Sequence, residues 1–369
     1  MKQRGSKATQ KEDTEKKGVY YVLGVFLAVL VLHFVVLPEV FAGRFDRAEA
    51  EGTASSTKSL FGVKKEVEPL TFDAAIYDKK MRQLANYGTS TTASSTRAWP
   101  VKTVYPKAGA LLPYNRIVSY YGNFYSKGMG VLGQYDTETM LAKLDHEKKV
   151  WEAADPTTPV IPAIHYIAVT AQGTAQADGT YRLRMPGTEI QKAIDLANRI
   201  HGVAFIDVQV GLSDLPRELP RLEPYLKNPN VHLGVDPEFS MHNGVKPGRV
   251  IGTMSSSDIN YAVSFLDRIA RENNLPPKIL VIHRFTEGMV TGSRNIKPTE
   301  NVQVVMDMDG WGFGAKKINT YKRVITQEPV QFAGFKLFYK NDVLPPSTRM
   351  LTPKEVLSLQ PKPSYIQYQ

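Results

Sequence analysis

Cysteine is absent from all 369 residues. Its absence excludes disulfide bonds, thiolate metal ligands, a cysteine nucleophile and the lipid-bearing cysteine of a lipoprotein. Three motifs are also missing: the sequence has no GxxxxGK[ST] loop, no GxGxxG after an expected strand and no GxSxG turn. Phosphate-binding loops and the serine-hydrolase turn of the α/β type are therefore not expected.

Long basic runs are lacking too, although the net charge is +10, from 46 basic and 36 acidic residues. No basic stretch is interleaved with aromatic residues in the way that tracks a nucleic-acid backbone. We expect no nucleic-acid partner. The simplest explanation of the net positive charge is a basic surface exposed to solvent. The functional explanation is that the protein lies next to an anionic polymer of the cell envelope.

One apolar run stands near the start of the chain. Residues 18–37 include no Asp, Glu, Lys or Arg, and His33 is the only residue among them that can be charged near neutral pH. Twenty such residues match the hydrocarbon thickness of a bilayer. Six basic residues precede the run, so the positive-inside rule predicts a cytoplasmic tail over 1–17, a single-pass anchor over 18–38 and an extracytoplasmic remainder. Cleavage after Ala42 would instead release a secreted protein.

Residues 39–113 have the composition of a low-complexity stalk. The stretches 51–58 and 89–97 are rich in Ser, Thr and Ala and too poor in apolar residues to build a core. Between them, 72–84 has the pattern of one short helix. We expect a tether without a binding role of its own, followed by the main domain over 114–369.

From residue 114 onward the sequence repeats one pattern about eight times: a β-branched apolar run, then a helical stretch. This alternation indicates βαβ units, and eight of them over roughly 250 residues is the plan of a (β/α)8 barrel of the TIM type. The expected strands are 117–121, 160–169, 203–209, 231–238, 279–283, 302–309, 332–340 and 365–369. Such barrels carry their chemistry at the carboxyl ends of the strands, so the last polar residues of each run are site candidates.

The intervening stretches predict helices over 136–154, 188–201, 257–274, 318–326 and 352–359. Residues 215–226 contain Pro216, Pro220 and Pro224, which predict two short turns rather than one regular helix. Asp178-Gly179 predicts a hairpin within 171–186.

Acidic residues gather at the expected strand ends, where residues two apart share a face. The catalytic candidates are Asp236 and Glu238 on the fourth run and Asp307 and Asp309 on the sixth. The substrate-binding candidates are Asp207, Gln209, His283, Arg284, Lys336, Tyr121, Trp311 and Gln367. Charges are rarely buried unless paired, and so many at one mouth favour a functional cluster over isolated helix caps.

Two carboxylates in one cleft repel, so one of them retains its proton while the other stays ionised. Glycoside hydrolysis uses that division between an acid and a nucleophile or base. Aromatic residues near the expected mouth suit stacking against sugar rings, and they are Tyr120, Tyr121, Phe124, Tyr125, Trp311, Phe313, Tyr339 and Tyr368.

Two short stretches carry a family resemblance. Asp236-Pro237-Glu238 resembles the Asp-x-Glu signature of glycoside hydrolase barrels of the chitinase and muramidase types, which implies that Glu238 donates the proton and Asp236 supports it. Residues 306–310 resemble the Met-x-Tyr-Asp segment of chitinase-like barrels, with Met308 in place of the Tyr. The barrel as a whole, from 120–123 to 365–369, resembles uncharacterised bacterial envelope and lipoprotein barrels, and this resemblance implies no activity.

Two other functions fit the same residues. The acidic candidates together with His283 offer oxygen ligands and one imidazole for a divalent metal, as in a metal-dependent hydrolase or isomerase, although no HxH or HExxH spacing occurs. A non-catalytic carbohydrate-binding domain is the second. The favoured hypothesis is a membrane-anchored barrel that hydrolyses cell-wall or surface polysaccharide without a cofactor.

Overall fold

The computed structural model describes residues 71–88, 98–242 and 244–369. The expected cytoplasmic tail, the anchor over 18–38 and most of the first half of the stalk lie outside these residues. Among the residues that are described, no helix is both long and apolar enough to cross a membrane.

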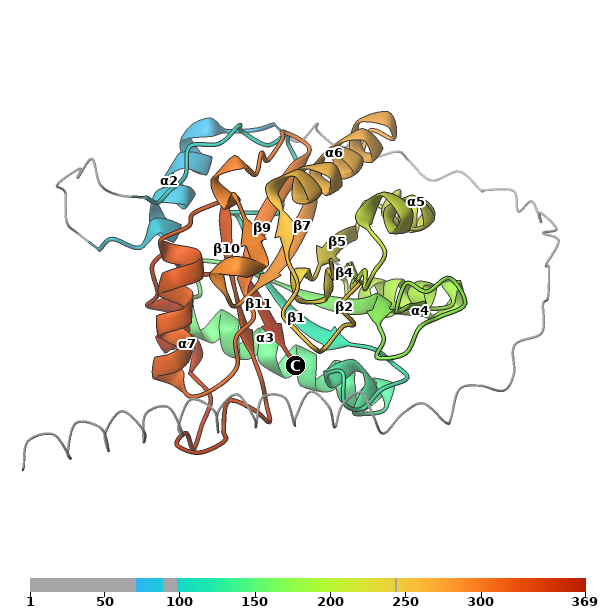
Figure 1. Cartoon of the computed structure of the whole chain (residues 1–369). Helices are drawn as coiled ribbons and strands as arrows, with labels where there is room; N and C mark the ends of the chain where they lie inside the picture. Colours follow the sequence, from blue (N-terminus) through green and yellow to red (C-terminus); the bar gives the residue numbers. More distant parts are fainter. Residues whose placement is uncertain (1–70, 89–97, 243) are drawn as a thin grey trace, which may run out of the picture. The chain divides into compact units, whose positions relative to one another are not determined.

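Eight parallel strands form a closed barrel surrounded by helices (Figure 1). The strands are β1 (Arg116–Gly122), β2 (Val160–Ala171), β4 (Val203–Val208), β5 (Val231–Val235), β7 (Lys278–Arg284), β9 (Val302–Met308), β10 (Phe332–Leu337) and β11 (Tyr365–Tyr368). The barrel closes because β1 pairs with β2 on one side and β11 on the other. The expected barrel is confirmed, and each of its strands coincides with one of the apolar runs.

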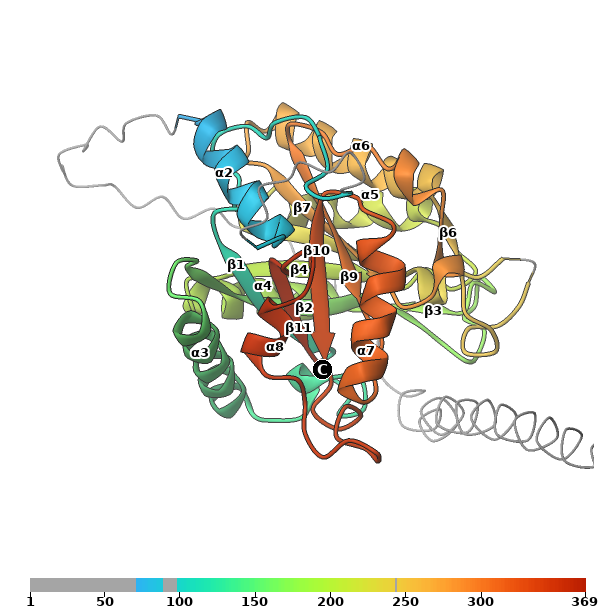
Figure 2. The same cartoon turned by 90° about the vertical axis from the view of Figure 1, so that its left-hand side faces the viewer.

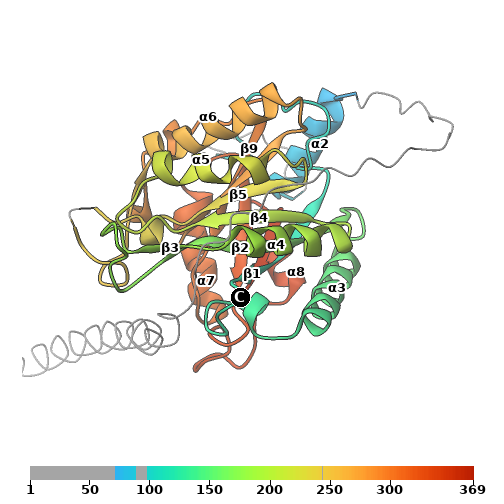
Figure 3. The same cartoon turned by 90° about the vertical axis from the view of Figure 1, so that its right-hand side faces the viewer.

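Helices cover the outside of the barrel. They are α3 (Thr137–Ala154), α4 (Gly187–Arg199), α5 (Leu215–Leu226), α6 (Ser256–Glu272), α7 (Gly314–Tyr321) and α8 (Pro353–Leu357). Figure 3 shows α4 and α5 along the side formed by β2, β4 and β5. The shorter elements are η1 (Val131–Gly133), η2 (Pro237–Phe239), β6 (Met254–Ser255), η3 (Glu287–Met289), β8 (Val290–Thr291), η4 (Ser293–Asn295) and the π-helical turn η5 (Lys322–Thr326).

Helix α5 corrects one expectation, because Leu215–Leu226 is a single helix despite its prolines. Pro216, Pro220 and Pro224 are four residues apart and therefore line up along one face, which is exposed. The carbonyls that lose their intrahelical partners there can accept hydrogen bonds from water. The opposite face buries leucines such as Leu219 and Leu222 against the barrel, and that burial stabilises the helix.

The barrel unit begins at Phe72, upstream of the expected boundary at 114. Helix α2 (Ala74–Ala85) starts at Asp73, whose carboxylate accepts hydrogen bonds from two backbone N–H groups of the first turn. Tyr77 and Met81 of α2 share one apolar cluster with residues inside the barrel such as Phe332. In Figure 2, α2 lies at the end from which the strand arrows start. Helix α2, which lies within the expected stalk, therefore covers the amino end of the barrel.

Strand β2 is the longest of the barrel and continues past its neighbour. It pairs with β1 as far as Tyr166 and then, to Ala171, with β3 (Arg182–Arg184) in antiparallel fashion. The hairpin expected around Asp178-Gly179 is confirmed. Its return strand is fastened to α5, because Arg182 and Arg184 place their Nε atoms 2.9 and 2.7 Å from the two carboxylate oxygens of the fully buried Glu218.

Candidate functional site

The inward-facing side chains change from apolar to ionisable along the strands. On β4, Phe205 belongs to the apolar interior cluster, and Asp207, the next residue on that face, is fully buried. On β9, Val305 is followed in the same way by Asp307. Because side chains alternate along a strand, the residues two positions further on also point inward. The carboxyl half of the interior is therefore polar, as predicted from the polar residues at the ends of the expected strands.

Lys336 and Asp309 form an ion pair at the mouth. The Lys336 Nζ atom on β10 lies 3.0 and 3.1 Å from the two carboxylate oxygens of Asp309, which follows β9. The same ammonium lies over the ring of Tyr121, 3.9 Å from its centroid. Burial acts to raise the pKa of Asp309, but Lys336 and His283 hold it below its ordinary value. Asp309 is therefore an ionised carboxylate in the described structure.

Asp236 and Glu238 follow β5 on the same mouth. Asp236 starts the turn η2 and its Oδ1 accepts a hydrogen bond of 3.1 Å from the Glu238 backbone N–H. Burial, then the charge of Asp236 and then that of Asp309, raise the pKa of Glu238 well above its usual value. Burial, opposed by His283 and reinforced by Asp207 and Asp309, raises the pKa of Asp236 to about 7. The raised pKa favours the protonated form of Glu238, and the side chain is partly exposed, so this group lies within reach of solvent.

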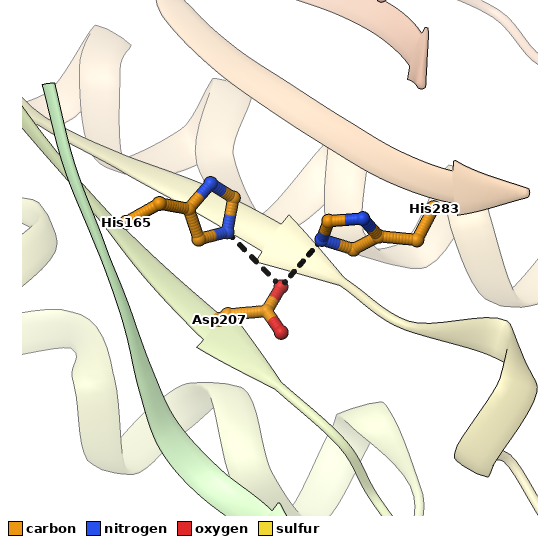
Figure 4. A group of neighbouring side chains, drawn as sticks. All are labelled: His165, Asp207 and His283. Carbon is orange, nitrogen blue, oxygen red and sulfur yellow. Dashed lines mark hydrogen bonds and ion pairs between the residues drawn. The ribbon is translucent and has the colours of Figure 1, made fainter. Parts of the chain in front are cut away.

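A second group lies deeper, where no side-chain surface reaches solvent. His165 on β2 and His283 on β7 flank Asp207 on β4 (Figure 4). The Asp207 Oδ1 atom is 3.2 Å from His165 Nε2 and 3.4 Å from His283 Nε2. Tyr121 donates a hydrogen bond of 3.1 Å to the other oxygen of Asp207. We call His165, Asp207 and His283 the His–Asp–His cluster.

Surrounding groups fix the two rings of this cluster. His283 Nδ1 lies 3.1 Å from Asp309 Oδ2 and 3.5 Å from Asp307 Oδ2. Burial lowers the pKa of His165 to about 4. For His283 burial acts in the same direction, but Asp207, Asp307 and Asp309 outweigh it and raise its pKa well above the ordinary value. The buried carboxylates thus create a strongly cation-attracting region around His283.

Two glycines make room for these side chains. A Cβ atom at Gly234, on β5, would collide with Asp207 Oδ1 and His165 Nε2. A Cβ atom at Gly334, on β10, would meet Asp307, which is its partner in the neighbouring strand. Both glycines have ordinary backbone angles, so it is the absence of a side chain that these positions require.

Most of the sequence-derived candidates converge inside the barrel. The candidates that point into its carboxyl half are Tyr121, Asp207, Gln209, Asp236, His283, Asp307, Asp309, Lys336 and Gln367, with Glu238 at the rim. Gln209 connects two of them, because its amide nitrogen lies 3.3 Å from Asp236 Oδ2 and 3.4 Å from the Tyr121 hydroxyl. Gln367 donates to the Tyr365 hydroxyl at 2.8 Å.

Arg284 does not join them. It is adjacent to the inward-facing His283 and so points to the opposite side of the strand. There its guanidinium donates to backbone carbonyls, including that of Thr286 at 3.1 Å, and forms an ion pair of 2.8 Å with Glu328. Arg284 was expected among the substrate-binding residues, but it lies apart from the other candidates, and its donors hold together the segment after β7.

Several expected mouth aromatics also lie elsewhere. Tyr120, Tyr339 and Tyr368 contact one another on the outer wall, where Tyr368 accepts a hydrogen bond of 2.9 Å from the Trp151 indole of α3. Trp311, in the loop after β9, is partly buried and has the Lys316 ammonium 4.7 Å from its ring centroid. Tyr121 is the expected aromatic that lies among the ionisable side chains.

His165 is the residue that the sequence analysis overlooked. It stands in the middle of the long run of β2, whereas only strand ends were considered. In register it pairs with Tyr121, the penultimate residue of β1, so it lies at the level where that shorter strand ends. The signal that would have identified it is a polar residue, within an unusually long strand, at one of the alternate positions whose side chains point into the barrel.

The comparisons with known proteins add no assignment. No family model matches the chain, and no curated protein matches it significantly.

Proposed function

We propose that this barrel hydrolyses a glycosidic bond in a cell-envelope polysaccharide, with Glu238 as proton donor and Asp309 as the ionised carboxylate that stabilises or attacks the sugar. The proposal depends on one observation above all. The pKa values of two carboxyl groups at one barrel mouth are shifted in opposite directions: that of Glu238 is raised by burial beside Asp236, and that of Asp309 is lowered by its ion pair with Lys336. An acid and a carboxylate at one mouth are what glycoside hydrolysis requires.

The two carboxyl groups differ in their access to a substrate in a way that fits these roles. Glu238 is partly exposed at the rim, whereas Asp309 is largely covered. A glycosidic oxygen that enters from solvent therefore meets the protonated group first. Tyr121, beside Lys336, supplies an aromatic side chain close to the ionised carboxylate.

The test is the release of reducing ends from peptidoglycan or from purified wall polysaccharide by the full chain. Glu238→Gln keeps the size of the side chain and removes its acidic proton, so kcat should fall by about 10²- to 10⁴-fold. Glu272→Gln, at the exposed end of α6, is the matched control and should leave kcat unchanged. Hydrolysis that survives Glu238→Gln would refute the assignment of the proton donor.

The pH dependence gives a second measurement. Glu238 acts in its protonated form, so kcat should decline as pH rises through its raised pKa, and the charged groups that surround it are Asp236, His283, Asp309 and Lys336. A rate that increases steadily into the alkaline range would contradict the proposal. Saturable binding of the polysaccharide without any turnover would show a binding domain in place of an enzyme.

The proposal also places the barrel outside the cytoplasmic membrane, held by residues 18–38, because an envelope polysaccharide is found there. Fractionation of cells that express the full chain should recover it with membranes, and protease added to spheroplasts should digest the barrel. Protection from the protease in intact spheroplasts would contradict this location.

A further inference from the structure

We propose that the His–Asp–His cluster binds one divalent transition-metal ion inside the barrel, beneath the mouth carboxylates. The three residues offer one ligand atom each, and these atoms all lie within 4.8 Å of one another. This site is distinct from the proposed glycan chemistry and does not depend on it.

The geometry of the three ligand atoms supports the proposal first. Both Nε2 atoms face the same oxygen of Asp207, at 3.2 and 3.4 Å (Figure 4). Around a tetrahedral zinc ion with bonds of about 2.0 to 2.1 Å, neighbouring ligand atoms are about 3.3 Å apart. Two of the three separations therefore already match those of a coordination sphere.

The placement of protons around His283 supplies the second argument. Its Nδ1 lies 3.1 Å from Asp309 Oδ2 and 3.5 Å from Asp307 Oδ2, so a proton on Nδ1 would face both carboxylates, although neither contact has the geometry of a hydrogen bond. Its Nε2 then presents a lone pair to Asp207 Oδ1, which is also electron-rich. Among the described residues neither ring nitrogen of His283 has a hydrogen-bond partner, although the side chain is fully buried. A metal ion bound by both atoms removes this repulsion, and the competing explanation is a second proton on His283.

His165 is held in a comparable way from its far side. Its Nδ1 lies 2.6 Å from the Tyr365 hydroxyl and 3.1 Å from the Gln367 amide nitrogen. The Gln367 oxygen is buried without a partner in the described part of the chain. Turning that amide over lets the oxygen accept the Nδ1 proton, which leaves the Nε2 lone pair of His165 free for a metal. Partners of this kind on the outer nitrogen are typical of metal-bound histidines.

The charge balance points the same way. Asp307 is fully buried, and neither of its carboxylate oxygens has a hydrogen-bond partner among the described residues. Together with Asp207 and Asp309 it places three carboxyl groups around His283. Lys336 pairs with Asp309, and a divalent cation compensates the other two carboxyl groups more fully than one extra proton on His283 does. Two imidazoles with one carboxylate favour Zn²⁺, Mn²⁺, Fe²⁺ or Co²⁺ over Mg²⁺ and Ca²⁺, which prefer oxygen ligands throughout.

The experiment uses the untagged full chain, stripped with a chelator and titrated with Zn²⁺, with bound metal counted by elemental analysis. We expect one equivalent. His283→Gln and Asp207→Asn should each weaken Zn²⁺ binding more than about 100-fold, and Asp307→Asn, which alters a supporting group, about 10- to 100-fold. His232→Gln is the matched control, because His232 is equally buried in the barrel but hydrogen-bonds the backbone of Ile279 instead.

Stoichiometric binding that persists in both His283→Gln and Asp207→Asn would overturn the proposal, since it would come from a surface site. A wild-type chain that takes up no Zn²⁺ would overturn it equally and would identify His283 as a buried imidazolium.

Because a buried substitution can prevent folding, the wild-type chain carries a second measurement with Co²⁺. Visible absorption bands of cobalt bound by nitrogen and oxygen should appear and saturate at one equivalent, and their absence would refute the site. None of these measurements involves glycan, so their failure leaves the hydrolysis test unaffected.

Discussion

The two halves of the barrel interior are both largely shielded from water, but they are filled by opposite kinds of side chain. The amino half contains residues such as Phe332 and Val281 and is covered by α2, whereas the carboxyl half contains Asp207, His283 and Asp307. Burial of one large apolar side chain stabilises a fold by about 1.5 to 3 kcal/mol. Burial of charge is unfavourable unless it is well paired. The amino half, which we call the closed end, therefore stabilises the barrel. The carboxyl half, which we call the open end, lowers the stability of the fold.

The largest expected effect on stability comes from the closed end. Phe332→Ala removes a fully buried ring and should lower the free energy of unfolding by about 3 to 5 kcal/mol, as measured by urea denaturation. Phe313→Ala is the matched control, because the Phe313 side chain is 38% exposed, and it should cost less than about 0.5 kcal/mol. Equal losses for the two variants would break the contrast between the halves.

The open end should respond to pH in the opposite sense to an ordinary ion pair. The pKa of Asp236 is raised to about 7 in the folded chain, above its value of about 3.9 in an unfolded one. The folded state therefore gains stability from the protonated form below about pH 4 and loses it as pH rises through about 7. The charged groups facing Asp236 are Asp207, Glu238, His283, Asp309 and Lys336.

Asp236→Asn removes that dependence. Relative to the wild type, the variant should gain up to about 4 kcal/mol in unfolding free energy between pH 4 and pH 8, as measured by urea denaturation across that range. Glu355→Gln is the contrasting variant, since Arg349 lowers the pKa of Glu355 to about 2. It should be less stable than the wild type at neutral pH, with the difference vanishing toward pH 2. Parallel curves for the wild type and Asp236→Asn would contradict the raised pKa.

A smaller effect on the free energy of unfolding is expected at Gly234, which has no side chain beside the His–Asp–His cluster. Gly234→Ala forces a methyl group against Asp207 and His165 and should cost about 1 to 3 kcal/mol. A Cβ atom at Gly288 would meet nothing within 4 Å, so Gly288→Ala should leave the urea midpoint nearly unchanged. If the two variants behave alike, the room for the cluster does not depend on the glycine.

The fold was predictable because each strand of the barrel is a continuous apolar run, and alternation with helices then fixes the parallel arrangement. The single helix at 215–226 was not predictable in this way. The expectation that proline interrupts a helix considers each proline by itself, whereas these three prolines share the exposed face of the helix. Helix α2 was assigned to the stalk because the segments that flank it are poor in apolar residues. Its few buried side chains gain their importance because they cover the amino end of the barrel.

The sequence predicted those site residues that stand at the ends of strands. Asp207, Asp236 and Asp309 point inward because each stands where a strand ends on the inner parity. The same criterion included Arg284, on the outer parity, and omitted His165, since β2 extends beyond the mouth. Strand length and parity depend on the register between neighbours, which a single sequence does not contain.

The extension of β2 and its return strand bears on how a ligand can enter and leave. Arg182 and Arg184 fix this ribbon to Glu218 before any ligand arrives, so binding requires no loss of conformational entropy on that side of the entrance. In the strand order of the barrel β9 is opposite β2. We therefore expect the residence time of a bound ligand to respond less to substitutions in this prearranged ribbon than to substitutions in the loop after β9, which carries Trp311.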